Sequence, residues 1–365
     1  KSESTGEKNA KNLNDIDPAQ VRMLFGNRIV LSKTTISAFA ECPYRFWGEF
    51  ILNLREQKHN NVGYADSGSY IHYVLEKFIS ELRLPDGTLR QTDKDTAEEI
   101  LNRLTNNYVS NIGCMLSPSL LYRFSRLRDL TFIMAKSILD EFSDSMFRIA
   151  AFEEKITDRS ESRLKPLEIK TDPYDGQSPA VCLCGTVDRI DYYDDGNEVY
   201  LRITDYKTGS KSFKINEISN GKDLQLPAYL FTVASAENSG YFLNLTKGRI
   251  IRPAAALYLS ASEKDGKITP VRSGFILNNE NLLRASSARL DPDILAGITL
   301  TKENTFKGSP LVSTDEMSEL ENTLRHTVSS VARDIYAGKA PRRPSEDNCK
   351  FCKIRSGCSS ACIKR

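Results

Sequence analysis

The stretch that decides the fold is 185–209, GTVDRIDYYDDGNEVYLRITDYKTG. Within it, apolar and polar residues alternate over 199–203, which is the period-2 pattern of a half-buried strand. Asp205 and Lys207 follow two residues apart, so their side chains leave the same face of that strand. The pattern predicts a strand that carries a carboxylate and a lysine to the end of a buried apolar row.

A preceding strand, 181–193, runs into Asp195-Gly196, a dipeptide that favours a two-residue hairpin turn because both central positions need positive φ. We expect from this turn a register in which Asp188 faces Ile203. Asp205 would then be the diagonal neighbour of Asp188 on the same face, about 7–8 Å away. A shift of one residue would move Asp188 to the opposite face.

Two carboxylates and a lysine at one place fit metal-assisted phosphodiester hydrolysis. Carboxylates hold hard cations such as Mg²⁺ or Mn²⁺, which stabilise charge on a phosphate and lower the pKa of a bound water. The lysine can orient that water or stabilise the developing oxyanion. An Asp-x-Lys sequence alone is common, and a surface hairpin with solvated charges is the alternative. The presence of Asp188 on the same predicted face favours the metal site.

Size and composition exclude other classes of protein. The 365 residues carry a formal net charge of only +2, so any nucleic-acid binding must come from a local patch. No run of about 18 apolar residues and no signal peptide occurs, which predicts a cytoplasmic protein without a membrane span. The chain starts at Lys1 rather than Met, and we expect a segment of a longer protein with 1–30 as its N-terminal tail; a processed or trimmed start is the alternative. A GxxxxGK[ST] motif does not occur, so we expect no ATP hydrolysis by this segment.

The remaining periodicity predicts one elaborated α/β domain. Ser32 is expected to cap a helix that Cys42-Pro43 interrupts, and Ser313 or Thr314 to cap a long helix that Gly338 ends. Further helices are predicted at 18–25, 44–54, 66–84, 92–146 (with breaks near Gly113 and Pro118) and 224–236. Further strands are predicted at 148–157, near Tyr241, at 255–259 and at 274–277.

Several motifs, in order, resemble those of the PD-(D/E)XK nucleases in their RecB-like branch. They are GSYIHYVLEKF (68–78), GTVDRID (185–191), ITDYKTG (203–209) and LQLPAYL (224–230). LSKTTISAFAECPYRFW (31–47) is similar to the N-terminal motif of AddB-type subunits of bacterial helicase–nucleases. The resemblance implies a restriction-endonuclease-like α/β fold with a central mixed sheet flanked by helices. It implies a single domain over 31–365, with a helical insertion at about 88–147.

The resemblance also implies the ligands of the metal. His72, Asp188 and Asp205 would bind Mg²⁺ or Mn²⁺, with the backbone carbonyl of Tyr206 as a further ligand. Without the motif, a packed core histidine would be the better interpretation of His72.

The same resemblance implies the residues that act beside the metal. Lys207 would be the catalytic lysine, next to the carboxylates of Asp188 and Asp205. Gln225 and Tyr229 match a Gln-x-x-x-Tyr motif that supports the site.

Other charged residues match no motif. We expect three glutamates to form salt bridges or to be solvated charges: Glu76, Glu153 and Glu154. An arginine cluster in the helical region could line a nucleic-acid path, although a solvated helix face is the better account; it comprises Arg123, Arg126 and Arg128.

The C-terminal cysteines form a separate pattern. Cys349-x2-Cys352-x5-Cys358 places three thiolates within ten residues, and a Cys₄ site needs a fourth. The resemblance supplies Cys42 and implies a [4Fe–4S] cluster that clasps the N- and C-terminal parts together. Zinc is the alternative that the spacing leaves open, and Cys362 is a spare candidate ligand. The other cysteines are expected to pack: Cys114, Cys182 and Cys184.

The function implied by the resemblance is a Mg²⁺-dependent DNA nuclease, expected to act as an exonuclease on single strands. It would work with an AddA-like helicase–nuclease subunit in double-strand-break repair. A stand-alone RecB-like or CRISPR-associated nuclease is one alternative, and a catalytically inert DNA-binding scaffold is another. The presence of Asp188, Asp205 and Lys207 together favours an enzyme.

Overall fold

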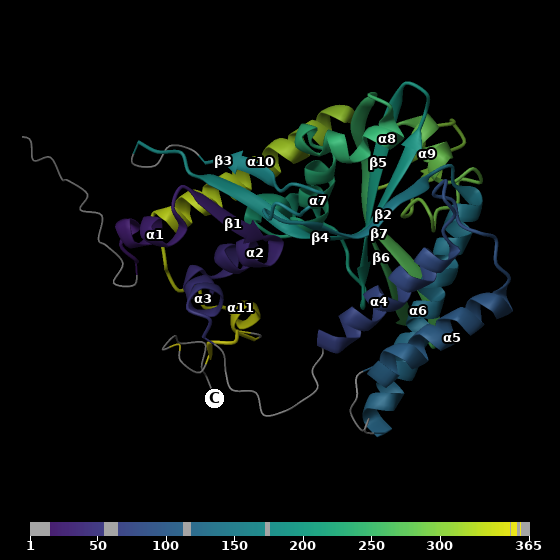
Figure 1. Ribbon diagram of the computed structural model, residues 1–365, viewed down its shortest axis with the longest axis horizontal. Helices are drawn as coiled ribbons and strands as arrows, with labels where there is room; N and C mark the ends of the chain where they lie inside the picture. Colours follow the sequence, from purple (N-terminus) through teal and green to yellow (C-terminus); the bar gives the residue numbers. More distant parts are fainter. Residues whose placement is uncertain are drawn as a thin grey trace, which may run out of the picture.

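The computed structural model describes residues 15–54, 65–111, 118–171, 176–350, 352–355 and 358. Figure 1 shows a mixed sheet with helices on both sides, as predicted. The helices are α1 (Pro18–Phe25), α2 (Lys33–Glu41), α3 (Pro43–Phe46), α4 (Ala65–Leu82), α5 (Lys94–Asn111), α6 (Pro118–Asp144), α7 (Gln225–Val233), α8 (Leu243–Thr246), α9 (Glu280–Ser286), α10 (Thr314–Tyr336) and α11 (Glu346–Lys350). A π-helical turn, η1 (Trp47–Ile51), and two 3₁₀ turns, η2 (Ile215–Asn220) and η3 (Ala236–Phe242), complete them.

The sheet is organised around one long strand, β4 (Ala180–Asp194). Its strand order is β1-β4-β5-β6-β7-β10, and both β2 and β3 also pair with β4. The pairs β1–β4, β5–β6 and β7–β10 are parallel, whereas β2–β4, β3–β4, β4–β5 and β6–β7 are antiparallel. The other strands are β1 (Arg28–Ser32), β2 (Arg148–Ile156), β3 (Leu167–Lys170), β5 (Glu198–Lys207), β6 (Ile250–Lys264), β7 (Lys267–Leu277) and β10 (Leu311–Val312), with a separate β8 (Thr299–Leu300) and β9 (Phe306–Lys307) pair.

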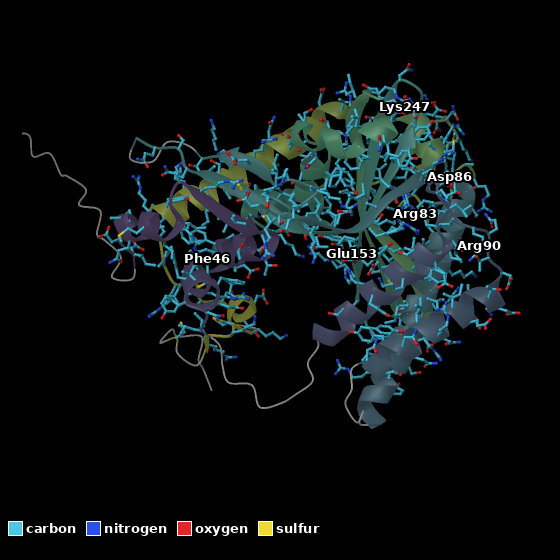
Figure 2. All side chains as sticks on the ribbon, viewed as in Figure 1. Phe46, Arg83, Asp86, Arg90, Glu153 and Lys247 are labelled. Carbon is cyan, nitrogen blue, oxygen red and sulfur yellow. The ribbon has the colours of Figure 1, made fainter. Side chains whose placement is uncertain are left out.

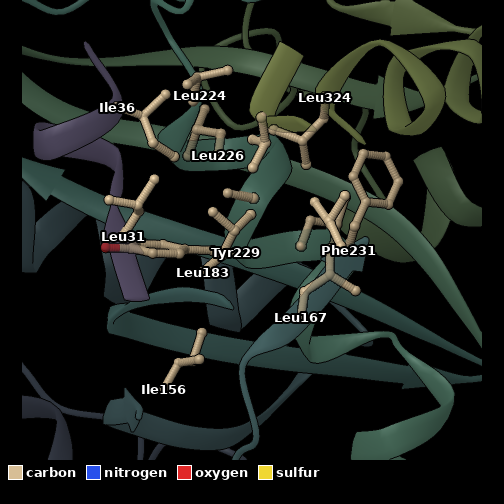
Figure 3. Close-up of a cluster of buried hydrophobic side chains, with 14 of the residues drawn as sticks. Leu31, Ile36, Ile156, Leu167, Leu183, Leu224, Leu226, Tyr229, Phe231 and Leu324 are labelled. Atoms are coloured by element: carbon tan, nitrogen blue, oxygen red, sulfur yellow. The ribbon is translucent and has the colours of Figure 1, made fainter. Parts of the chain in front are cut away.

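The two largest of four hydrophobic clusters in the described residues cover the two faces of the sheet. Figure 3 shows part of the first, in which Ile36 of α2, Tyr229 of α7 and Leu324 of α10 lie near Leu183 of β4. The second core packs α4, α5 and α6 against Tyr206 of β5 and against Leu259 and Ala261 of β6. Burial on both sides explains why β5 is protected from solvent along nearly its whole length.

A buried ionic network attaches α6 to the sheet. The Glu141 carboxylate of α6 lies 3.1, 2.6 and 3.0 Å from the guanidinium nitrogens of Arg189, Arg202 and Arg272. Asp191 also pairs with Arg189 and Arg202. Burial opposes ionisation of Glu141, but the three arginines outweigh it and hold its pKa well below the ordinary value. Helix α6 is therefore fixed to β4, β5 and β7 by charge as well as by apolar packing.

The predicted helix ends are largely confirmed. Ser32 and Ser313 each form a capping box, with Thr35 and Glu316 respectively, and Gly338 follows α10 with a φ of 71°. Two predictions are wrong. Tyr241 lies in a 3₁₀ turn rather than a strand, and the predicted helix 44–54 is divided into α3 and the π-helical turn η1.

The charged and sulfur-containing residues that matched no catalytic motif can also be placed. Arg126 and Arg128 are exposed and pair with Glu263 and Asp129, as expected of a solvated helix face. Cys182 is buried in β4, where it packs as predicted. Residues 1–14, Cys114 and Cys362 lie outside the described residues. Among the residues that the structure describes, no helix is both long enough and apolar enough to cross a membrane. The sequence predicts that the domain begins at residue 31, after an N-terminal tail, and this position falls inside β1.

Candidate active site

The β4–β5 hairpin has a different register from the one predicted. Ile190, rather than Asp188, lies opposite Ile203, and the same register continued by two residues places Asp188 opposite Asp205. The predicted pairing of Asp188 with Ile203 is therefore wrong by two residues. Because side chains alternate with a period of two, this shift leaves both carboxylates on the same face.

The longer turn accounts for the shift. Asp195 Oδ1 accepts hydrogen bonds from the backbone N–H groups of Asn197 and Glu198, at 2.8 and 2.7 Å. Gly196 supplies the left-handed conformation, with a φ of 94°. An Asp side chain that binds the backbone beyond it stabilises a wider turn, so four residues, 195–198, lie beyond the last β4–β5 pair, Asp194 with Val199, instead of two.

Asp188 joins three elements at the end of the hairpin. It is 4% exposed, and its Oδ2 accepts a 2.6 Å hydrogen bond from the backbone N–H of Tyr206. Its Oδ1 lies 3.3 Å from Nδ1 of His72, which comes from α4. Burial and the neighbouring carboxylate of Asp205 raise the pKa of Asp188 to about 6. Crowded carboxylates of this kind are stabilised when a cation joins them.

His72 lies between two carboxylates. Its Nδ1 is 3.3 Å from Asp188 and 3.4 Å from Oε1 of Glu153. Burial disfavours the imidazolium, but hydrogen bonds to the two carboxylates outweigh it and raise the pKa of His72 to about 10. One ligand atom from each of the three residues lies within 4.8 Å of the others, which is close enough to share a metal ion. A bound cation would replace the proton that the imidazole otherwise carries.

The sequence interpretation missed the position of Glu153. Its salt bridge to His72 agrees with that interpretation, but the same contact brings its carboxylate to the metal-binding set. Glu153 lies on β2 across from Asp188, and its φ of 45° is unusual for a non-glycine residue. Figure 2 labels it beside the strands, above α4. No local pattern reveals this, because the pairing of β2 with β4 is set by distant residues.

Glu76 and Glu154 behave as interpreted from the sequence. Glu76 pairs with the adjacent Lys77, and Glu154 pairs with Arg163 and accepts a hydrogen bond from the hydroxyl of Tyr241.

Asp205 belongs to a second cluster that α7 positions. The carboxylate is 1% exposed, pairs with the ammonium of Lys207 and accepts a hydrogen bond from Nε2 of Gln225. Gln225 Oε1 accepts from Lys207 at 3.0 Å and also from Lys33, the first residue of α2. Burial and repulsion by Lys207 lower the pKa of Lys33 to about 8. The sequence interpretation had no role for Lys33, which lies 192 residues before Gln225 in the chain.

Tyr229, one turn after Gln225, depends on a glycine. A Cβ built at Gly185 would lie 2.5 Å from the Tyr229 hydroxyl oxygen, closer than atoms can approach. Burial and the nearby Asp205 carboxylate raise the pKa of Tyr229 to about 12, so the phenol stays protonated. The glycine that opens the GTVDRID motif therefore makes room for the tyrosine that follows β5.

The donor set fits a hard divalent cation. The carboxylates of Asp188 and Glu153 converge on the imidazole of His72. Asp205 is linked to this set because the next residue, Tyr206, donates its backbone N–H to Asp188. Carboxylate oxygens are the ligands that Mg²⁺ prefers, and Mn²⁺ accepts imidazole as well. The arrangement can hold a metal beside an ammonium group, that of Lys207.

The cysteines lie at the far end of α2. Cys42, between α2 and α3, lines one pocket together with Cys349, Cys352 and Cys358. Lys353, the residue after Cys352, pairs with the buried Glu49 of η1 at 2.7 Å. Within the described part of the chain, no three of these four sulfur atoms lie within 4.8 Å of one another, as the ligand atoms of the His72 set do. The predicted residues are therefore brought to one pocket without a closed coordination shell.

Comparison with known proteins identifies the family. The model of the PD-(D/E)XK nuclease superfamily matches residues 30–359. The chain is 25% identical to the B-type ATP-dependent helicase/deoxyribonuclease subunit of Clostridium kluyveri (strain NBRC 12016), over 94% of this chain and 31% of that protein. The proteins of the same name from Clostridium botulinum (strain Hall) and Desulfitobacterium hafniense (strain DSM 10664 / DCB-2) are 26% and 27% identical over 94% and 92% of this chain. The chain spans 31%, 31% and 30% of these three relatives. Because the family match extends over nearly the whole chain, hairpin included, the chain belongs to the PD-(D/E)XK nuclease superfamily.

Proposed function

We propose that this chain is a Mg²⁺- or Mn²⁺-dependent deoxyribonuclease domain that hydrolyses phosphodiester bonds, acting as an exonuclease on single-stranded DNA. The observation that carries the proposal is a chain of contacts: Asp188 contacts His72 and accepts from the backbone N–H of Tyr206, and the preceding residue, Asp205, pairs with Lys207. Membership of a nuclease superfamily supports the reaction class. Three relatives that are named helicase/deoxyribonuclease subunits support DNA as the substrate.

The proposed metal ligands are His72, Asp188, Asp205 and the backbone carbonyl of Tyr206, and we add Glu153. When bound, the cation would stabilise charge on the phosphate and lower the pKa of a bound water. The carboxylate of Asp188 is held for this task by the Tyr206 N–H at 2.6 Å. His72 reaches the same point from α4, so the helical region contributes directly to the centre.

The proposed role of Lys207 is to stabilise negative charge that develops on the phosphate oxygens. Asp205 and Gln225 Oε1 hold its ammonium in place, so the group is preorganised and loses little conformational freedom when it contacts the phosphate. Gln225 in turn orients the Asp205 carboxylate through its Nε2. Tyr229 packs at Gly185 and keeps the first turn of α7 in register with the hairpin.

We propose further that Cys42, Cys349, Cys352 and Cys358 hold a [4Fe–4S] cluster within a single domain over 31–365. Their convergence on one pocket supports the assignment, and zinc is the competing occupant. Such a centre would join α2 and α3 to the C-terminal segment. Iron, sulfide and zinc analysis of protein purified without oxygen distinguishes the two metals, and a Cys352→Ala variant should lose the metal and unfold at a lower temperature.

The proposed context is a helicase–nuclease that repairs double-strand breaks together with an AddA-like subunit. Its support is the name of the relatives, of which this chain matches about a third. An end-labelled single strand and the matching duplex, incubated with Mg²⁺ or with EDTA, test the reaction itself. Stepwise shortening of the single strand with Mg²⁺ alone is expected, and no cleavage of either substrate would refute the proposed function.

A further inference from the structure

A cleft of about 300 Å³ lies beside the candidate active site, between α2 and the end of β5. Three lysines line it: Lys33 from α2, Lys207 from β5, and Lys211, which follows β5. Lys207 already has a part in the proposed reaction. The other two lysines have none, although the cleft continues from Gln225, which contacts the site.

Positive charge in this cleft exceeds the negative charge that faces it. Lys207 pairs with Asp205 and Lys211 pairs with Asp223. Lys33, in contrast, makes no ion pair with any residue that the structure describes; its ammonium donates to Gln225 Oε1. The wall also contains Arg45 and Glu41, but these pair with each other and add no net charge.

Two ammonium groups share one neutral acceptor, since Lys33 and Lys207 both donate to Gln225 Oε1. Burying one cation next to another costs free energy unless an anion lies between them. Lys33 is also the first residue of α2, where the N-terminal backbone N–H groups add a partial positive charge. The carboxylates of Asp205 and Asp188 attract the Lys33 ammonium, but neither forms an ion pair with it among the described residues, so the cleft keeps positive charge that a phosphate can contact.

We propose that Lys33, assisted by Lys211, binds the sugar–phosphate backbone of the substrate strand next to the scissile phosphate. The inference rests on the proposed nuclease function and adds the path of the strand, along the cleft between α2 and β5. Lysine suits this contact because its ammonium is a mobile point charge that follows successive phosphates without reading bases. The contact is therefore independent of sequence.

The experiment measures binding of a labelled oligothymidylate, with Ca²⁺ in place of Mg²⁺, over a series of KCl concentrations. Each lysine–phosphate contact on a single strand contributes a slope of about 0.7 to the plot of log affinity against log salt. Lys33→Met should reduce that slope by about 0.7 and weaken binding about tenfold. Lys33→Arg, which keeps the charge, should retain the wild-type slope.

Lys247→Met is the matched control, because Lys247 is exposed and lies at the other end of the sheet from Glu153 (Figure 2). It should leave both slope and affinity unchanged. With Mg²⁺, Lys33→Met should raise KM more than it lowers kcat, and the midpoint of thermal unfolding should not move.

Two outcomes would overturn the inference. If the wild type binds and cuts the strand while Lys33→Met shows the same slope and affinity, the assignment of Lys33 fails and the proposed function stands. If the wild type neither binds nor cuts, the proposed function fails, and this inference fails with it.

Discussion

The hydroxyl of Tyr229 occupies the space that a side chain at Gly185 would need, so the first residue of the GTVDRID motif and α7 fit together as a pair. The contact joins the two parts of the candidate site, because Gly185 precedes Asp188 on β4 and Tyr229 follows Gln225 on α7. A change at this contact should therefore be felt at the carboxylates.

We predict that Gly185→Ala displaces Tyr229 and lowers the free energy of unfolding by about 1–3 kcal/mol, the usual range for overpacking. Cleavage should fall with it, because Gln225 moves with the helix. Gly209→Ala is the control, since a Cβ there meets no atom within 4 Å. Chemical denaturation and nuclease assays measure both effects, and a Gly185→Ala variant as stable as Gly209→Ala would contradict the packing argument.

Glu153→Gln should weaken metal binding. The substitution keeps the size of the side chain and removes the charge that faces His72 and Asp188. We expect the affinity for Mn²⁺, measured by calorimetry, to fall about 10- to 100-fold. Glu76→Gln, on the same helix as His72 but paired with its neighbour Lys77, should bind Mn²⁺ like the wild type. Equal affinities for all three proteins would remove Glu153 from the metal centre.

The buried network at Glu141 makes a stability prediction. Glu141→Gln leaves three buried guanidinium groups without their shared carboxylate and should cost about 3–5 kcal/mol. Glu280→Gln breaks an exposed pair with Arg284 and should cost less than about 0.5 kcal/mol. Urea titrations of the two variants give both values, and similar small losses would show that the network contributes little.

The same carboxylate predicts a dependence on pH. The folded-state pKa of Glu141 is depressed, so its stabilising contribution is present above the pKa of the unfolded chain, about 4.3, and is lost as pH falls below it. The difference in unfolding free energy between wild type and Glu141→Gln should be constant from about pH 8 to 5.5 and shrink below about pH 4. A difference that does not change down to about pH 3 would disprove the assignment.

The sequence was sufficient for what depends on periodicity and short motifs. The alternation along β5 placed Asp205 and Lys207 on one face, and that face is buried as far as the site. The register was wrong because an Asp195 side chain widened the turn, an interaction that the Asp-Gly signal does not encode. Because the shift is two residues, Asp188 stays on the same face of the hairpin as Asp205, and the predicted pair of carboxylates is retained.

Two members of the site could not be found from the sequence. Glu153 reaches the metal set through the pairing of β2 with β4, and Lys33 reaches Gln225 across the space between two helices. Both contacts join residues far apart in the chain. Glu153 lies in no motif, and the 31–47 motif that contains Lys33 does not reveal its contact with Gln225. Their positions follow from tertiary packing alone.

Asp188, Asp205 and Lys207 form the proposed metal-dependent nuclease centre. The most direct measurement compares the cleavage of end-labelled single-stranded DNA in Mg²⁺ by the wild type and by Asp205→Asn, with Asp158→Asn, a change at an exposed ion pair, as control. We predict that Asp205→Asn loses at least about 100-fold in rate while its circular dichroism spectrum stays that of the wild type, and that Asp158→Asn cuts normally. Cleavage by a folded Asp205→Asn at the wild-type rate would contradict it.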